Sequence, residues 1–239
     1  MSYLVDSYHR ETVAAAPVSE RVRFIRRTYA HLGVAVAAFV GIEAVLFSTG
    51  LGADILKTMF AFNGAWLGLM VLFIVGGIAA QLMARSRSSP ALQYAGLTLY
   101  VLLEVVIFLP ILMIAEAKFP GQHLPLQAGT LTLAVFGGLT AAVFWSGKDF
   151  SFLGPVLWVC SFLALGLLVA AMIGGFNVGL VFMVAMVALA AGFIIYDTSN
   201  IIHHYGTDQY VAASLNLFAS LALLFWYILQ FFMNARDDG

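Results

Sequence analysis

The sequence predicts an all-α polytopic membrane protein with seven transmembrane helices. Of its 239 residues, 62% are hydrophobic and only 10% are charged, and the mean hydropathy is +0.98. Soluble domains are nearer half apolar and a quarter charged. The chain also contains seven apolar runs that each approach the ~20 residues a helix needs to cross a bilayer. Strands of a membrane barrel would be about 10 residues long and alternating in character, and these runs are longer and uniformly apolar.

Short polar or glycine-containing links separate the expected spans. The spans cover residues 28–50, 61–83, 91–115, 125–146, 151–173, 176–202 and 209–233. We therefore divide the chain into a cytoplasmic N-terminal leader, 1–27, a seven-helix membrane domain, 28–233, and a short tail, 234–239. The leader is polar and charged rather than apolar, so it does not have the pattern of a cleaved signal peptide.

The distribution of basic residues indicates how the spans are oriented. With seven spans and the leader inside, eight of the eleven Lys and Arg residues lie on the inner side and three on the outer side. Cytoplasmic loops of membrane proteins carry an excess of Lys and Arg. We therefore predict a multi-pass protein with its N-terminus in the cytoplasm and its C-terminus outside.

Several function classes are excluded by what the sequence lacks. A net charge of −1 does not provide the basic field that binding to nucleic-acid phosphates needs. The expected span 209–233 contains no Asp or Glu, so the paired carboxylates of an aspartyl protease are missing. H-E-x-x-H and G-x-S-x-G motifs are absent, and the last lysine, Lys148, lies in a loop. We expect no enzyme activity, no catalytic residue and no cofactor.

Acidic residues inside the expected spans are the strongest functional signal. A carboxylate at membrane depth costs roughly 2.5–3.5 kcal/mol on insertion scales, so it is rare unless it faces a protein interior or water. Glu43, Glu104 and Asp197 lie in the first, third and sixth spans. Each has an alternative role as a neutral acid that hydrogen-bonds across helices. Asp197 differs because polar residues surround it, from Tyr196 to Asn200, and these can supply hydrogen-bond donors.

The seventh expected span has a polar face that can meet Asp197. Asn216 and Ser220 are four residues apart, so they share one face of a helix. An antiparallel hairpin through the short link 203–208 brings that face to Asp197.

Basic residues lie at the same, cytoplasmic, side. Arg85 and Arg87 end the second expected span, and one of them either pairs with Asp197 in a closed state or serves as a plain positive-inside anchor. His203 and His204 follow at the membrane boundary. Histidines can act as pH sensors, although boundary histidines are usually solvated.

Taken together, these stretches resemble the transmembrane Bax-inhibitor-motif family, and the likeness spans nearly the whole chain. Its clearest parts are Gly147-Lys-Asp-Phe-Ser-Phe-Leu-Gly154 after the fourth span and Tyr196-Asp-Thr-Ser-Asn-Ile-Ile-His203 in the sixth. The second stretch is followed by Thr207-Asp-Gln-Tyr210 and Ser214-Leu-Asn-Leu-Phe-Ala-Ser220. In that region the sequence is most similar to the bacterial, YccA-like branch of the family.

The resemblance implies a central seventh helix surrounded by the other six. It also implies a pH-sensitive cation leak, chiefly of calcium, in several members. In those members aspartates of the sixth and seventh helices share a proton, and an arginine of the second helix latches the closed form. Here Asp197 matches the sixth-helix position, Ser220 stands at the seventh-helix position, and the arginine corresponds to Arg85 or Arg87. Calcium prefers six to eight oxygens, so Asp197, the only candidate ligand, would bind Ca²⁺ or H⁺ weakly.

Two functions remain open from the sequence. The first is a YccA-like regulator of a membrane protease such as FtsH in the bacterial inner membrane, with the leader as its cytoplasmic handle. The second is a pH-sensitive calcium or cation leak gated around Asp197. The partners implied are membrane lipids together with a membrane protease complex or Ca²⁺ and protons. The residues assigned to ion sensing or gating are Asp197, Ser220, Asn216, Arg85, Arg87 and Glu104.

Overall fold

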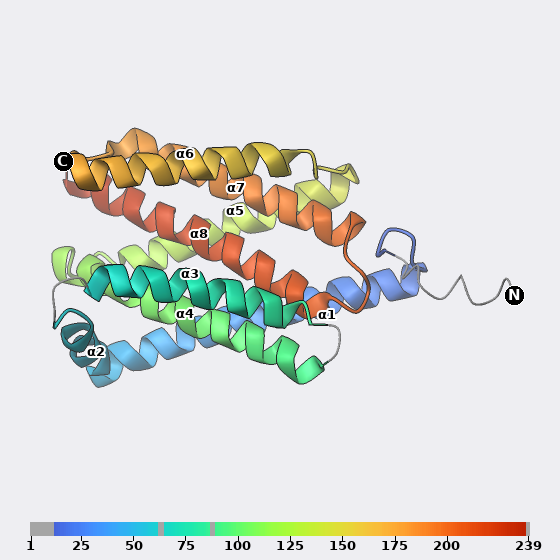
Figure 1. Ribbon diagram of the computed structural model, residues 1–239, viewed down its shortest axis with the longest axis horizontal. Coiled ribbons are helices and arrows are strands. Elements are labelled where there is room, and N and C mark those ends of the chain that lie inside the picture. The colour runs from blue at the N-terminus through green and yellow to red at the C-terminus, as the bar shows by residue number, and fades with distance from the viewer. Residues whose placement is uncertain (1–11, 62–64, 87–88, 238–239) are drawn as a thin grey trace, which may run out of the picture.

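The protein is a bundle of long helices (Figure 1). The computed structural model describes residues 12–61, 65–86 and 89–237. Eight helices form within those residues: α1 (Val18–Thr49), α2 (Leu51–Met59), α3 (Ala65–Ala84), α4 (Pro90–Lys118), α5 (Leu124–Ser146), α6 (Leu153–Gly174), α7 (Gly179–His203) and α8 (Tyr210–Asp237). All except α2 are long and apolar enough to cross a membrane. The predicted fold class, an all-α protein with seven spans, is confirmed.

Helix α8 occupies the centre of the bundle, as the resemblance implied. It packs against α1, α3, α4, α5 and α7, and 72% of its most apolar stretch is buried. Figure 1 shows α8 crossing between α6 and α7 on one side and α1, α3 and α4 on the other. Helix α6 packs mainly against α7, with 6% of the equivalent stretch buried. The α4 helix is the second interior helix, with 67% buried.

Helix α1 begins at Val18 rather than near residue 28, so the boundary predicted at residue 27 falls inside a helix. Arginine favours helices nearly as strongly as leucine, which explains why the polar stretch before the apolar run is helical. The 32 residues of α1 extend about 48 Å, which exceeds the ~30 Å hydrocarbon core. Figure 1 shows α1 projecting beyond its neighbours where the chain begins. We call this the leader end of the bundle.

The segment before α1 folds back onto the link between α7 and α8. The backbone N–H of Val13 donates to the carbonyl of Tyr205 at 2.9 Å, and Val13 is fully buried. Thr12 forms an isolated antiparallel bridge with Gly206. The guanidinium of Arg21 donates to the carbonyls of Val13 and Ala14, at 3.2 and 2.7 Å. Residues 12–17, which we call the strap, are therefore tied to the α7–α8 link.

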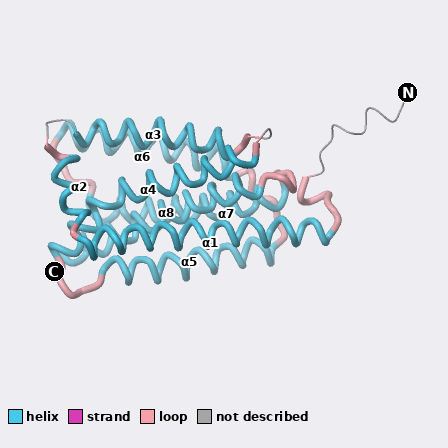
Figure 2. The backbone as a smooth tube through the Cα atoms, turned by 90° about the horizontal axis from the view of Figure 1, so that it is seen from below, coloured by secondary structure: helices cyan, strands magenta, loops and turns pink. Residues whose placement is uncertain are grey.

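Helix α1 begins at one end of the bundle and α8 ends at the other, and the strap lies at the leader end (Figure 2). The short helix α2 lies at the far end, where the sequence predicted only a link around Gly52. A Cβ on Gly52 would approach Leu109 of α4 to 3.2 Å, so α2 is packed closely on the bundle. The second expected span began at residue 61; α3 begins at Ala65, and residues 62–64 lie outside the described residues.

A close backbone contact joins the end of α3 to α4. A Cβ on Gly96 of α4 would lie 2.5 Å from the carbonyl oxygen of Ala80 and 2.6 Å from the amide nitrogen of Ala84. Only glycine fits such an approach without displacing the backbone. This contact holds the end of α3, and with it Arg85, beside the first turns of α4.

Candidate functional site

A hydrogen bond between α7 and α8 forms the centre of the candidate site. The hydroxyl of Ser220 on α8 donates to Oδ2 of Asp197 on α7. The two helices form the most extensive helix pair of the bundle, and their antiparallel course brings the two side chains to one level. Ser220 is buried and Asp197 is half-buried. The structure thus brings together the serine and the aspartate that the sequence analysis assigned to one site.

Asn216 reaches a partner that the sequence analysis did not consider. Its Nδ2 donates to the hydroxyl of Tyr205 at 2.6 Å. Tyr205 lies in the α7–α8 link and is half-buried. Its pKa is raised to about 12, first by burial and then by the negative charge of Asp197, whereas the positive charge of Arg85 acts in the opposite direction. The phenol therefore keeps its proton throughout the physiological pH range.

Arg85 follows the last turn of α3 and faces the same region. Its charge acts on both Asp197 and Tyr205, although within the described part of the chain no ion pair within 4 Å joins it to Asp197. Arg85 is exposed, so its positive charge acts on the carboxylate of Asp197 from the edge of the site. The other arginine that was considered, Arg87, lies outside the described residues.

Two residues of α4 extend the polar cluster into the bundle. Tyr100 and Glu104 are one turn apart and interact electrostatically, and they are only 7% and 4% exposed. The charge of Asp197 also acts on Tyr100. Glu104 is thus linked to Asp197 through Tyr100, which the sequence analysis did not identify. The sequence signal that could have identified Tyr100 is its spacing, four residues before the glutamate at position 104.

The polar residues that flank Asp197 in sequence do not donate to it, contrary to our expectation. Among the described residues, the only hydrogen bond to its carboxylate comes from Ser220. Successive residues of a helix point about 100° apart, so Thr198 and Ser199 face other elements. Thr198 is fully buried beside Tyr29 of α1. Ser199 instead accepts a hydrogen bond from the backbone N–H of Phe150 at 2.7 Å.

Asp149, in the loop between α5 and α6, joins that loop to the end of α7. Its Oδ1 accepts hydrogen bonds from the Ser151 N–H at 2.8 Å and from the Ser199 hydroxyl at 3.3 Å, and its Oδ2 lies 3.1 Å from Nε2 of His204. The Ser151 N–H, with a smaller contribution from the charge of His204, lowers the pKa of Asp149 to about 2. The two stretches that carried the family resemblance are therefore in contact at the leader end.

Comparison with known proteins identifies the family. The model described as "Inhibitor of apoptosis-promoting Bax1" matches residues 21–237, which is most of the chain. The protein belongs to the Bax inhibitor family. The two motif stretches around Asp149 and Asp197 both fall inside the matched region.

Its relatives in this family include proteins from a virus, a fungus and a plant. The chain is 30% identical to the Golgi anti-apoptotic protein of Vaccinia virus (strain Lister) over 229 residues, which cover 94% of this chain and 91% of the relative. It is 30% identical to Bax inhibitor 1 of Schizosaccharomyces pombe over 237 residues, which cover 95% of this chain and 82% of the relative. It is 41% identical to the BI1-like protein of Arabidopsis thaliana over 119 residues, which are 44% of this chain and 43% of that one.

The hydrogen bond at the centre of the site predicts energetic coupling between α7 and α8. In a double-mutant cycle with Asp197→Ala and Ser220→Ala, we expect a coupling free energy of about 0.5–3 kcal/mol, because both substitutions remove the same interaction. Denaturant unfolding in detergent measures it. Ser161→Ala serves as the control, since the Ser161 hydroxyl donates to a carbonyl of its own helix and should be additive with Asp197→Ala. Additivity in both cycles would contradict the assignment.

The depressed pKa of Asp149 predicts a pH-dependent contribution to stability. A carboxyl whose pKa is lowered in the fold stabilises the protein above its usual pKa of 3.8, and this stabilisation is lost as the pH falls towards about 2. In thermal unfolding in detergent, the midpoint temperature of the parent should therefore lie above that of Asp149→Asn at pH 6. This difference in midpoint should disappear near pH 2.

Asp54→Asn is the matched control for this measurement. Asp54 forms an exposed pair with Lys57 at 3.4 Å, and exposed pairs contribute little. We expect it to leave the midpoint nearly unchanged at pH 6. A difference between the parent and Asp149→Asn that is the same at pH 6 and pH 2 is the result that contradicts this assignment.

Proposed function

We propose that this member of the Bax inhibitor family is a membrane protein without enzyme activity that passes cations slowly across the bilayer, under the control of protonation at Asp197. The polar cluster inside an otherwise apolar bundle carries this proposal. Asp197 accepts a hydrogen bond from Ser220, feels the charge of Arg85, and is coupled through Tyr100 to Glu104. Ionisable groups at membrane depth that face a bundle interior are typical of ion and proton pathways.

The sign of the pH response follows from the charges. Ionised Asp197 attracts Arg85, which follows the last turn of α3, and so favours the arrangement in which Arg85 stays close to the end of α7. Protonation of Asp197 removes this attraction, which favours movement of Arg85 away from Asp197. The leak therefore increases as the pH falls. At Asp197 a divalent ion meets one formal negative charge beside a hydroxyl and an arginine, which suits transient passage of Ca²⁺ better than storage.

Flux through reconstituted vesicles tests this proposal. We expect calcium flux into liposomes to rise as the pH is lowered for the parent protein, and to become nearly independent of pH for Asp197→Asn. Arg85→Gln should raise the flux at neutral pH, because it removes the positive charge that holds Asp197. Lys148→Gln removes one positive charge from a loop at the same end and should behave as the parent does. No flux in the parent, or the same pH profile for the parent and Asp197→Asn, would rule out the leak.

A second candidate function rests on the strap. Because residues 12–17 bond to the link that carries Tyr205, a protein that binds the preceding residues would act directly on the region beside Asp197. This favours a regulatory role like that of the YccA-like modulators of the FtsH protease. Under this proposal the protein lies in a bacterial inner membrane, with the leader in the cytoplasm and the C-terminus outside.

Co-purification tests the regulatory role. The full chain and a chain lacking residues 1–11 should be isolated from bacterial membranes under identical conditions. We expect a membrane protease to co-purify with the full chain and to be strongly reduced with the shortened one, which keeps the strap and α1. If no membrane protease accompanies the full chain, this candidate function is excluded, whereas the flux measurement stands on its own.

A further inference from the structure

The first turns of α1 carry a basic face that the Asp197 cluster does not use. Arg23, Arg26 and Arg27 are exposed. Arg26 and Arg27 follow Arg23 by three and four residues, so each lies next to Arg23 on the helix surface. With Ala30 and His31 they line a surface depression of about 420 Å³. Within the described part of the chain, neither Arg23 nor Arg26 has a hydrogen-bond or ion-pair partner.

Aromatic side chains hold one side of this depression in place. The guanidinium of Arg27 lies over the ring of Tyr210, 5.4 Å from its centroid. Nδ1 of His31 lies 2.7 Å from the carbonyl oxygen of Arg27, and Nε2 lies 3.2 Å from the hydroxyl of Tyr94. The hydroxyls of Tyr94 and Tyr210 are 3.3 Å apart. Arg27 is thus positioned before any ligand arrives, which reduces the entropy lost on binding.

The depth of the depression in the bundle matches that of lipid headgroups. Tyrosines and arginines concentrate at the membrane–water boundary, and α1 is too long for its first turns to lie within the hydrocarbon. Directly below His31, Val34 is 69% exposed. Further along the same helix, Val40 and Val45 are also exposed. The basic depression therefore lies above an apolar surface that can contact an acyl chain.

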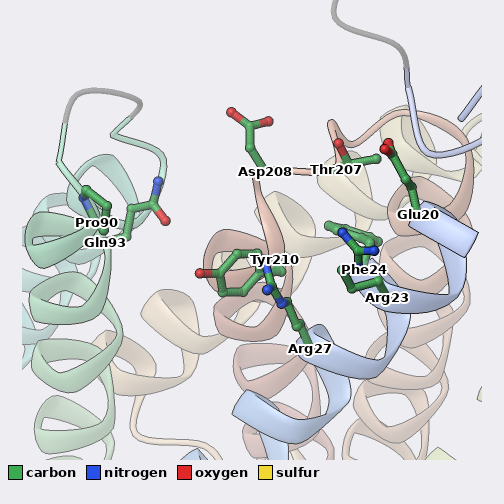
Figure 3. Close-up of a pocket in the computed structure, with 9 residues that line it drawn as sticks. All are labelled: Glu20, Arg23, Phe24, Arg27, Pro90, Gln93, Thr207, Asp208 and Tyr210. Carbon is green, nitrogen blue, oxygen red and sulfur yellow. The ribbon is translucent and has the colours of Figure 1, made fainter.

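A neighbouring cavity limits the charge that a ligand can carry. This cavity, of about 430 Å³, shares Arg23 and Arg27 with the depression and is also lined by Glu20, Gln93 and Asp208. Figure 3 shows Arg27 beside Tyr210. Arg23 and Glu20 lie closer to the start of α1, and Asp208 lies on the α7–α8 link. The two carboxylates repel a headgroup with several negative charges, whereas their oxygens can accept hydrogen bonds from an alcohol.

We propose that the basic face of α1 binds the headgroup of a monoanionic phospholipid. Arg23, Arg26 and Arg27 hold the phosphodiester, since guanidinium groups bind phosphate oxygens in a bidentate manner. The uncharged alcohol of the headgroup faces the cavity lined by Glu20 and Asp208, and one acyl chain follows α1 past Val34. This lipid site is independent of both functions proposed above.

Lipid-dependent stabilisation of the full chain tests the site. The protein in an uncharged detergent is titrated with short-chain phosphatidylglycerol, with phosphatidylcholine of the same chain length, and with inorganic phosphate. We expect phosphatidylglycerol alone to raise the thermal midpoint in a saturable way. Arg23→Gln/Arg26→Gln should weaken the apparent affinity by roughly ten-fold or more, because two charge-assisted contacts are lost. Lys148→Gln, which removes a positive charge at the same end, should retain the parent's affinity.

Retention of phosphatidylglycerol in native mass spectrometry is the second readout, and it does not depend on the midpoint of the variants. We expect bound lipid on the parent and on Lys148→Gln, and its loss from Arg23→Gln/Arg26→Gln. Equal stabilisation by phosphatidylcholine would overturn the proposal, because charge would then play no part. An equal shift with inorganic phosphate would also overturn it, as it would indicate a free-anion site. Unchanged lipid retention in the double variant would do the same.

Discussion

The pairing of α7 with α8 is the interaction on which the rest of the structure depends. It places the central helix α8 against the helix that carries Asp197, and the hydrogen bond from Ser220 fixes their relative position. In lipid, apolar surface gives little preference for one helix partner over another, so packing and interhelical hydrogen bonds decide which helices associate. A polar residue on each helix therefore specifies a pairing that the apolar residues around them leave open.

The sequence was sufficient to predict the fold class and the number of spans, because the length and hydropathy of the apolar runs carry that information. It also predicted that Asp197 and Ser220 are close, because the four-residue spacing of Asn216 and Ser220 defines one polar face on the last span. It could not identify α4 as an interior helix, since residues facing lipid are as apolar as those facing α8. The partners Tyr205 and Tyr100 were missed for a related reason. Tyr205 lies in a link and Tyr100 in the middle of α4, and only the tertiary structure shows that these two meet Asn216 and Glu104.

The polar stretch around Asp197 forms hydrogen bonds with two neighbouring elements, α8 and the α5–α6 loop. On one side of α7, Asp197 meets Ser220 of the central helix. On another, Ser199 bonds to the loop that carries Asp149. Two residues apart on a helix, these side chains point in clearly different directions. A short polar stretch can therefore join the end of α7 both to the interior and to the α5–α6 loop.

The strap joins the start of α1 to the link between α7 and α8. Hydrogen bonds from the strap and the contact of Arg27 with Tyr210 bind the start of α1 to the α7–α8 link. Helices α1, α7 and α8 are therefore joined at the leader end. Helix α3 packs chiefly against α4, and the close backbone contact at Gly96 holds its end there. A movement of Arg85 relative to Asp197 would consequently carry α3 and α4 together, as one unit.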